Sequence, residues 1–230
     1  MRLAFIFNYP LVDNVDWKKK AILELLTLGH EVDVYYGKTD FKEYLLAYLK
    51  RRKHHNTKLV SKNLAKKTKK NIAFFKEKGI EVHKIKNYNT TKAISKIAAS
   101  NYDYIISAID QILVKRFIRG VNTKVLNVHY ARLPEIKGMN AIEWNFLVNR
   151  KCELTLHYIN EGIDTGRIIK IAEIKIDDED CFFSMREKIQ NKIPEVIVDF
   201  VEGNMTDTMP NKGGKLYTYM HWEIKKLLKN

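Results

Sequence analysis

The sequence predicts an α/β protein with a doubly wound, mostly parallel sheet and a small C-terminal β/α extension. Two observations support this class. The first half of the chain alternates short apolar runs with segments of helical spacing, and the pattern changes after residue 140 to longer alternating runs. With 230 residues, 45% of them hydrophobic, the chain can bury a core without disulfides or structural metals, and its two cysteines cannot form a disulfide framework or a four-cysteine zinc site.

The first half of the chain predicts a βαβ opening that then repeats. Residues 2–7 form a short apolar run typical of a buried strand. Residues 15–28 place apolar side chains on one helical stripe, which Gly29 ends. Residues 31–36 alternate and are rich in β-forming side chains. Further strands are expected at residues 80–85, 103–108 and 124–128, and helices at 41–49, from 50 to about 78, and at 91–99.

The second half of the chain predicts a different arrangement. Residues 153–159 and 167–176 alternate over longer spans, which indicates an antiparallel pair. We also expect residues 167–176 and 213–220 to form exposed β-ribbons with apolar faces. Helices are expected at residues 141–148, 182–201 (kinked at Pro194) and 222–228, with a turn at 211–214.

The net charge of +14 is concentrated in one segment, because residues 50–70 contain ten Lys or Arg and no acidic residue. Such a segment forms either a solvated lysine-rich face or a patch that attracts polyanions. It contains no aromatic residue, which disfavours a stacking platform for single-stranded nucleic acid. The sequence has neither a GxGxxG nor a GxxxxGK[ST] motif, and its apolar runs are far shorter than the ~20 residues that span a bilayer. We expect an intracellular protein.

Three polar residues are candidates for chemistry. Asn127 and His129 lie two apart near the end of a predicted strand, so both point to the same side, and Asp164 lies in a loop between glycines. An amide can donate to an oxyanion, an imidazole can move a proton, and a carboxylate can orient the imidazole. Neither cysteine lies in a nucleophile motif, which favours acyl transfer by direct attack. Taken singly, each residue also fits a structural role.

The stretch from Asn127 to Ile169 resembles the 10-formyltetrahydrofolate-dependent formyltransferase family. The resemblance rests on several motifs in the same order, although Lys137 stands where the family often has Arg. These are Asn127-Val128-His129, Leu133-Pro134, Lys137-Gly138, Ile142-Glu143-Trp144, Thr155-Leu156-His157 and Glu161-Gly162-Ile163-Asp164-Thr165-Gly166.

The resemblance implies roles for residues. Asn127, His129 and Asp164 match the catalytic trio, and 10-formyltetrahydrofolate is the expected cosubstrate, with no metal. The residues expected to contact folate are Ser107, Ile109, Gln111, Ile112, Leu113, Gly162, Ile163 and Thr165. The residues expected to contact the acceptor are Tyr130, Lys137, Phe182, Tyr217 and Tyr219. We expect residues 1–178 to form the catalytic core and residues 179–230 a helix and tail for acceptor binding or dimerisation.

The resemblance most favours the small enzymes that formylate amino-dideoxy sugars on nucleoside diphosphates. The expected acceptor is a dTDP-linked sugar for surface polysaccharide. This expectation includes a cytoplasmic homodimer with no membrane or nucleic-acid partner. A formyltransferase for another small amine, such as glycinamide ribonucleotide, is an alternative, although residues 7–16 lack the glycine-rich phosphate loop of the glycinamide-ribonucleotide enzymes. A non-catalytic basic nucleic-acid-binding protein is the alternative from a different class.

Overall fold

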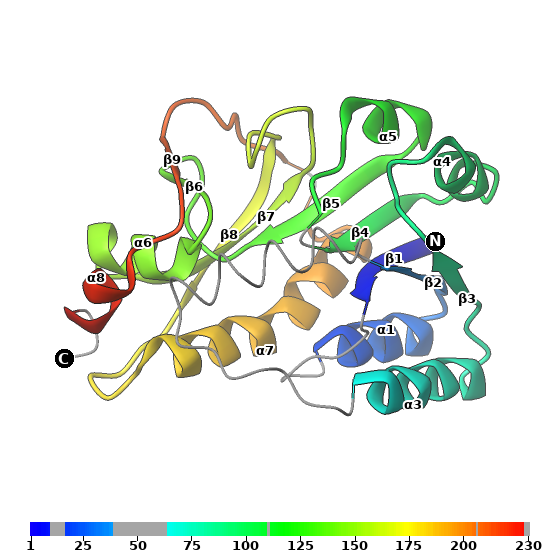
Figure 1. Ribbon diagram of the computed structural model, residues 1–230, viewed down its shortest axis with the longest axis horizontal. Coiled ribbons are helices and arrows are strands. Elements are labelled where there is room, and N and C mark those ends of the chain that lie inside the picture. The colour runs from blue at the N-terminus through cyan, green and yellow to red at the C-terminus, as the bar shows by residue number, and fades with distance from the viewer. Residues whose placement is uncertain (10–16, 39–63, 110, 206, 228–230) are drawn as a thin grey trace. The chain divides into compact units, whose positions relative to one another are not determined.

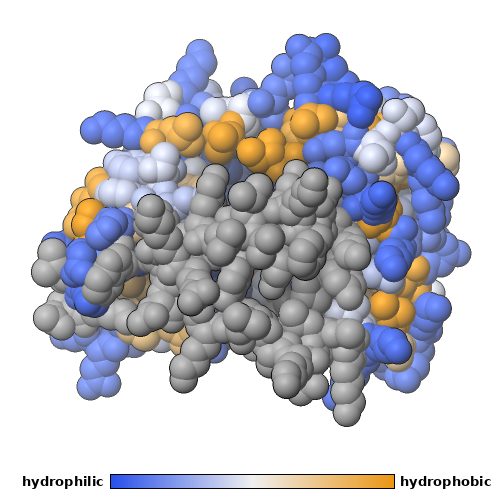
Figure 2. Space-filling model, in the orientation of Figure 1, coloured by the Kyte–Doolittle hydropathy of each residue, from blue (hydrophilic) through white to orange (hydrophobic). Residues whose placement is uncertain are grey.

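The computed structural model describes the chain except residues 10–16, 39–63, 110, 206 and 228–230. The helix expected at residues 41–49 and most of the basic segment 50–70 lie outside the described residues. On the face seen in Figure 2, hydrophilic side chains cover much of the described surface, with patches of hydrophobic side chains among them. No helix within the described residues has the length and apolar character needed to cross a membrane.

Seven strands form one sheet in the order β3-β2-β1-β4-β5-β7-β8 (Figure 1). β1 is parallel to β2 and β4, and β2 is parallel to β3, whereas β7 is antiparallel to both β5 and β8. This mostly parallel sheet confirms the predicted fold class. The strands are β1 (Arg2–Tyr9), β2 (Glu31–Lys38), β3 (Val82–Ile85), β4 (Tyr104–Ala108), β5 (Lys124–His129), β7 (Cys152–Tyr158) and β8 (Ile168–Ile174).

Most of the helices connect successive strands, as the alternating pattern of the first half predicts. The chain divides into two compact units, one of residues 1–14 and 25–125 and the other of residues 15–24 and 126–230. The helices are α1 (Trp17–Thr27), α3 (Leu64–Glu77), α4 (Thr91–Ala98), α5 (Lys115–Gly120), α6 (Ala141–Asn149), α7 (Phe182–Val201) and α8 (Trp222–Leu227).

The first unit is built around β1. All five side chains from Leu3 to Phe7 are fully buried. A strand with parallel neighbours on both sides and both faces covered needs apolar residues at every position, which explains its continuous apolar run. Around it, α3 packs against β3 and α4 packs against α5.

The second unit is built around β7, which lies between β5 and β8 and is buried from Cys152 to His157. Polar and apolar residues alternate along β7, but neither face of the strand is exposed to solvent from Cys152 to His157. The polar face is buried as well, and each of its side chains has a partner: Glu153 pairs with Arg132, Thr155 donates to the main chain of Ala131, and His157 contacts Asn127. α7 packs across β7 and β8 and contains Pro194 in its interior.

A second, two-stranded sheet pairs β6 (Ile136–Gly138) with β9 (Lys215–Tyr217) in parallel. The predicted β-ribbon at residues 213–220 contains β9, but the sequence does not predict its partner β6, because a three-residue strand is too short to show a period. Gly138 is required at this crossing, because its φ is 92° and an added Cβ would lie 2.2 Å from the main-chain oxygen of Tyr217. The pair attaches the C-terminal segment to the chain that follows β5.

The expectation of an exposed β-ribbon at residues 167–176 is wrong. The apolar residues Ile168, Ile169, Ala172 and Ile174 are all buried within the chain, so they provide no apolar face for a partner. The expected division of the chain at residue 178 stays a prediction, as does the homodimer.

We expect Thr155→Val to lower the free energy of unfolding by about 1–3 kcal/mol, although valine has nearly the same shape. The fully buried Thr155 hydroxyl donates to the oxygen of Ala131 at 2.7 Å and accepts from the N–H of Leu133 at 3.1 Å. Valine leaves both main-chain groups without these bonds. Urea unfolding measures the loss. Thr155→Ser, which keeps the hydroxyl, should lose less, and equal losses in the two variants would contradict this explanation.

Candidate active site

Asn127 and His129 lie on one face of β5, opposite two polar residues of β7. The antiparallel register pairs Asn127 with His157 and His129 with Thr155. Opposed residues in antiparallel strands point to the same side of the sheet, so four polar side chains gather there. His129 is only 6% exposed. The site therefore sits on a buried polar face and not on an open surface.

The imidazole of His129 lies between two acceptors. Its Nε2 is 2.8 Å from the main-chain oxygen of Ile136, and its Nδ1 is 3.5 Å from Oδ2 of Asp164. Carbonyl and carboxylate oxygens only accept, so Nε2 carries a hydrogen, and a hydrogen on Nδ1 as well would suit the carboxylate. The imidazolium form of His129 satisfies both neighbours. The longer distance on the Nδ1 side leaves that position accessible to a ligand acceptor that approaches in the plane of the ring.

The loop that carries Asp164 follows an unusual path. Asp164 has a φ of 50°, in the left-handed region, and its Oδ2 accepts a 2.8 Å hydrogen bond from the N–H of Gly138. At Gly166 an added Cβ would lie 1.8 Å from the main-chain oxygen of Tyr158. Only glycine permits this close approach. The loop geometry and the Gly138 bond together aim the carboxylate at His129.

His157 also lies at the site, although the sequence predicts it only as part of the motif Thr155-Leu156-His157 and gives it no role. Its Nδ1 lies 2.8 Å from the main-chain oxygen of Tyr158, so Nδ1 donates and Nε2 accepts from the amide of Asn127 at 3.2 Å. Burial, and then the neighbouring His129, lower the pKa of His157 to about 4. The ring is therefore neutral near pH 7. No signal in the sequence sets His157 opposite Asn127, because that pairing depends on the register of β5 against β7.

This contact determines the orientation of the Asn127 amide, because its nitrogen must face the accepting Nε2 of His157. One amide hydrogen is used there, and the second can serve a ligand. The arrangement offers an amide donor, an imidazole N–H donor and a carboxylate acceptor. A covalent route through Cys152 is disfavoured, because burial raises the pKa of its thiol to about 12. The chemistry that fits is acyl transfer by direct attack, and the catalytic roles of the three predicted residues stay a prediction.

The residues expected to contact folate fall into two sets. Gly162, Ile163 and Thr165 flank Asp164 in the second unit. The others lie at and after the end of β4 in the first unit, where Ile112 is 69% exposed and Gln111 donates to the side chain of Asn87 at 2.8 Å. The members of this set are Ser107, Ile109, Gln111, Ile112 and Leu113. Their contact with folate stays a prediction.

Among the residues expected to bind the acceptor, Lys137 and Tyr217 are brought together by the pairing of β6 with β9. Lys137 is buried and donates to the main-chain oxygen of Gly213 at 2.7 Å. The ring of Tyr217 lies 4.7 Å from that of Trp144 at an interplanar angle of 33°. Trp144 is named in the sequence analysis only as part of the motif Ile142-Glu143-Trp144. Its ring contact with Tyr217 adds it to the candidates for acceptor binding.

The other acceptor candidates have different neighbours. Phe182, at the start of α7, packs edge-on against Phe146 of α6, with ring centroids 5.9 Å apart. The guanidinium of Arg186 lies 5.7 Å from the centre of the Tyr130 ring. Tyr219 is half-buried two residues beyond β9. The structure thus gives Phe182 a packing role, and acceptor contacts for all three stay a prediction.

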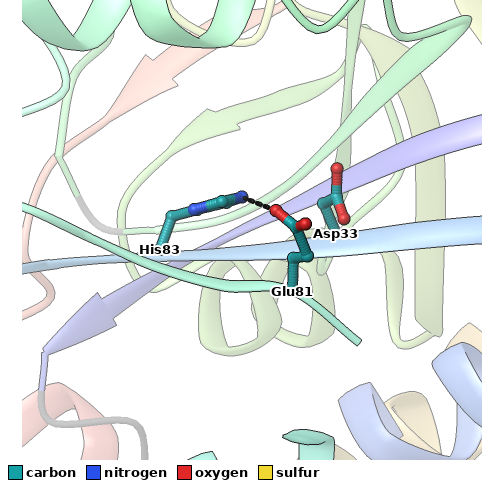
Figure 3. Close-up of side chains that lie close together, drawn as sticks. All are labelled: Asp33, Glu81 and His83. Carbon is teal, nitrogen blue, oxygen red and sulfur yellow. Dashed lines mark ion pairs between the residues drawn. The ribbon is translucent and has the colours of Figure 1, made fainter. Parts of the chain in front are cut away.

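Among the described residues, one group of side chains has the composition of a metal site (Figure 3): Asp33, Glu81 and His83 of the first unit, with ligand atoms within 4.8 Å of one another. All three already have partners. Asp33 accepts from the hydroxyl of Tyr102, and His83 lies 3.2 Å from Glu81. The ammonium of Lys96 lies 3.0 Å from Nδ1 of His83 and would repel a cation. We assign no metal to this group.

Comparisons with known proteins give a consistent result. Residues 32–201 match the model of the family described as formyl transferase. Methionyl-tRNA formyltransferase of Finegoldia magna is 28% identical over 130 residues, which are 54% of this chain and 42% of that protein. Phosphoribosylglycinamide formyltransferase of Bacillus subtilis is 36% identical over 67 residues, which are 29% of this chain and 34% of that protein. The chain spans less than half the length of these curated relatives.

Solved structures with a similar fold include sugar N-formyltransferases. One from Shewanella sp. FDAARGOS_354 has a TM-score of 0.63 at 16% identity, covering 100% of this chain and 87% of that one. PseJ of Anoxybacillus kamchatkensis has a TM-score of 0.53 at 18% identity, covering 94% and 85%. WlaRD has a TM-score of 0.59 at 16% identity, covering 94% and 69%. At these identities the likeness shows the fold.

We expect the free energy of unfolding to fall as the pH is lowered from about 6.5 to about 4. His157 stays neutral in the folded protein until about pH 4, whereas the unfolded chain protonates it near its ordinary pKa of 6.5. The unfolded state therefore binds more protons in this window, which favours unfolding. Urea titrations across the window measure the effect, and NMR titration of the imidazole measures the pKa itself.

His157→Gln should flatten this pH dependence, whereas His221→Gln, at an exposed position, should leave it as in the unmodified protein. Protonation of His157 near pH 6.5 in the folded protein would contradict the assignment of its low pKa to burial.

Proposed function

Because the chain belongs to the formyl transferase family, we propose that it transfers the formyl group of 10-formyltetrahydrofolate to the amine of an amino-dideoxy sugar on a nucleoside diphosphate, with dTDP as the nucleotide. The observation that carries this reaction is the cluster of Asn127, His129 and Asp164, linked by His157 within one unit. A cytoplasmic location, a homodimeric state and a product used in surface polysaccharide belong to the same proposal.

The cluster supplies each part of a direct transfer. When the acceptor amine attacks the formyl carbon, a C–N bond forms and the carbonyl oxygen gains negative charge, which the Asn127 amide and the Nδ1–H of His129 stabilise. As the bond from that carbon to N10 of the folate breaks, His129 gives its Nδ1 proton to N10. Asp164 takes the proton that the amine loses. Passing it from Oδ2 to Nδ1, 3.5 Å away, restores the starting state.

The aromatic pair of Trp144 and Tyr217 supports a nucleotide-bearing acceptor. Trp144 is held in place by donating from Nε1 to the oxygen of Thr218 at 2.9 Å. Two neighbouring rings offer an apolar surface of the kind on which a base can stack. The PseJ structure contains UDP-4,6-dideoxy-4-formamido-L-AltNAc and tetrahydrofolate, and WlaRD was solved with dTDP and a formylated folate. These ligands support a sugar nucleotide as the acceptor.

Two other functions are alternatives, and each has its own test. The relative from Bacillus subtilis favours glycinamide ribonucleotide as the acceptor, whereas residues 7–16 contain no glycine for a phosphate loop. Non-catalytic binding of nucleic acid would rest on the basic segment 50–70, most of which lies outside the described residues. Direct binding of DNA or RNA at moderate salt tests the second of these functions.

We expect turnover with 10-formyltetrahydrofolate and amino-sugar nucleotides, and none with glycinamide ribonucleotide. Asn127→Ala should lower kcat by about 10²–10³-fold through loss of an oxyanion donor. His129→Ala should lower it by about 10²–10⁴-fold through loss of the proton donor. Asp164→Ala should be comparably severe. Formylated products are measured by mass spectrometry across an acceptor panel.

The control for these variants is Lys170→Ala, at an exposed position on β8, which should keep the unmodified kcat. Thermal melts establish that each variant folds. If any of the three variants keeps near-normal turnover at saturating substrate, the role given to that residue is wrong.

We expect Tyr217→Ala to raise the KM for the acceptor about tenfold, with little change in kcat or in folate affinity. Removing one ring of the pair weakens binding of the base without touching the reacting atoms. Tyr217→Phe keeps the ring and should be nearly normal, and Leu216→Ala, at an adjacent exposed position, is the matched control. Unchanged acceptor KM with a large drop in melting temperature would leave Tyr217 a packing residue.

A further inference from the structure

Asn211 contacts the loop that carries Asp164. It lies between α7 and β9, where the sequence predicts only a turn. Its side-chain nitrogen donates to the main-chain oxygen of Asp164 at 2.9 Å and to that of Gly166 at 2.8 Å. Both hydrogens of the amide are therefore used, one on each side of Thr165. All of these residues belong to the second unit.

The chemistry of the two acceptors determines how the Asn211 amide is oriented. Main-chain oxygens only accept, so the nitrogen must face the loop and Oδ1 must point away. That oxygen is buried and has no hydrogen-bond partner within the part of the chain that the structure describes. An unpaired buried oxygen is unfavourable, which indicates that the two donated bonds are what this side chain contributes.

The loop needs such support because its own conformation is unfavourable. Asp164 is a non-glycine residue at a φ of 50°. The direction of its carboxylate, which reaches Gly138 and His129, depends on the main chain staying in that conformation. Asn211 bonds the main-chain oxygen of Asp164 itself and that of Gly166, two residues further along the loop.

We propose that Asn211 is a positioning residue for the transfer reaction: it holds the loop in the conformation that aims the Asp164 carboxylate at His129. It acts through the loop and does not touch the reacting atoms. This inference rests on the proposed function for its kinetic consequences, whereas its geometric consequence, the placement of Asp164 against His129, is measurable without substrate.

A matched control lies three residues away. Thr208 anchors the same segment through two hydrogen bonds from Arg167, one to its Oγ1 at 2.7 Å and one to its main-chain oxygen at 2.8 Å. Neither bond reaches Asp164. Thr208→Val therefore removes an attachment of the segment without releasing the loop, whereas Asn211→Ala releases the loop. Asn211→Asp keeps the shape of the side chain and removes both amide hydrogens.

The kinetic experiment compares these three variants under saturating folate and amino-sugar nucleotide. We expect Asn211→Ala and Asn211→Asp to lower kcat by about 10–100-fold, because a displacement of about 1 Å in a reacting group can cost that much. KM values should change by less than about threefold, and Thr208→Val should keep kcat within about twofold. A normal kcat in Asn211→Ala, or equal losses in Asn211→Ala and Thr208→Val, would overturn the proposal.

The second measurement is ¹⁵N NMR of the His129 imidazole as a function of pH, with no substrate. Asn211→Ala should shift the Nδ1 signal of His129 in the same direction as Asp164→Asn does, and Thr208→Val should leave it in place. If His129 is unchanged in Asn211→Ala, the proposal is wrong whatever the enzyme's acceptor. If the shift is present but no acceptor is formylated, the proposed function fails and the positioning of Asp164 stands.

Discussion

The antiparallel register of β5 against β7 is the constraint on which the rest of the site depends. It sets Asn127 opposite His157 and His129 opposite Thr155. A slip of one residue would turn every side chain of one strand to the other face, and the cluster would be lost. Thr155 also bonds the chain that follows β5. That chain then presents the main-chain oxygen of Ile136 to the His129 ring, so one register orients both the amide and the imidazole.

The third member of the cluster comes from a loop and not from a strand. Asp164, which has a left-handed conformation, makes two contacts that hold it: its carboxylate accepts from the N–H of Gly138, and its main-chain oxygen accepts from Asn211 of the C-terminal segment. The β6–β9 pair attaches that same segment to Gly138. The last part of the chain therefore contributes directly to the geometry around Asp164, at the side where Tyr217 meets Trp144.

Two buried histidines in one cluster have different hydrogen-bonding partners. His157 donates to a main-chain oxygen and accepts from an amide, which suits the neutral ring, and burial lowers its pKa to about 4. His129 faces two acceptors, which suits the charged ring. In the proposed reaction, His157 orients the Asn127 amide while His129 moves a proton. The neighbouring His129 also lowers the pKa of His157.

The sequence by itself determined the alternation of strands and helices, and most element bounds within a few residues, because each period depends on residues adjacent in the chain. Short contiguous motifs also pointed to Asn127, His129 and Asp164 as candidates, which the structure brings together and whose catalytic roles stay a prediction. Only the tertiary structure revealed the contact of His157 with Asn127, 30 residues away, and that of Asn211 with Asp164, 47 residues away. Local periodicity carries no information about such partners. They meet only when strand register and loop packing bring distant main-chain and side-chain groups within hydrogen-bonding distance.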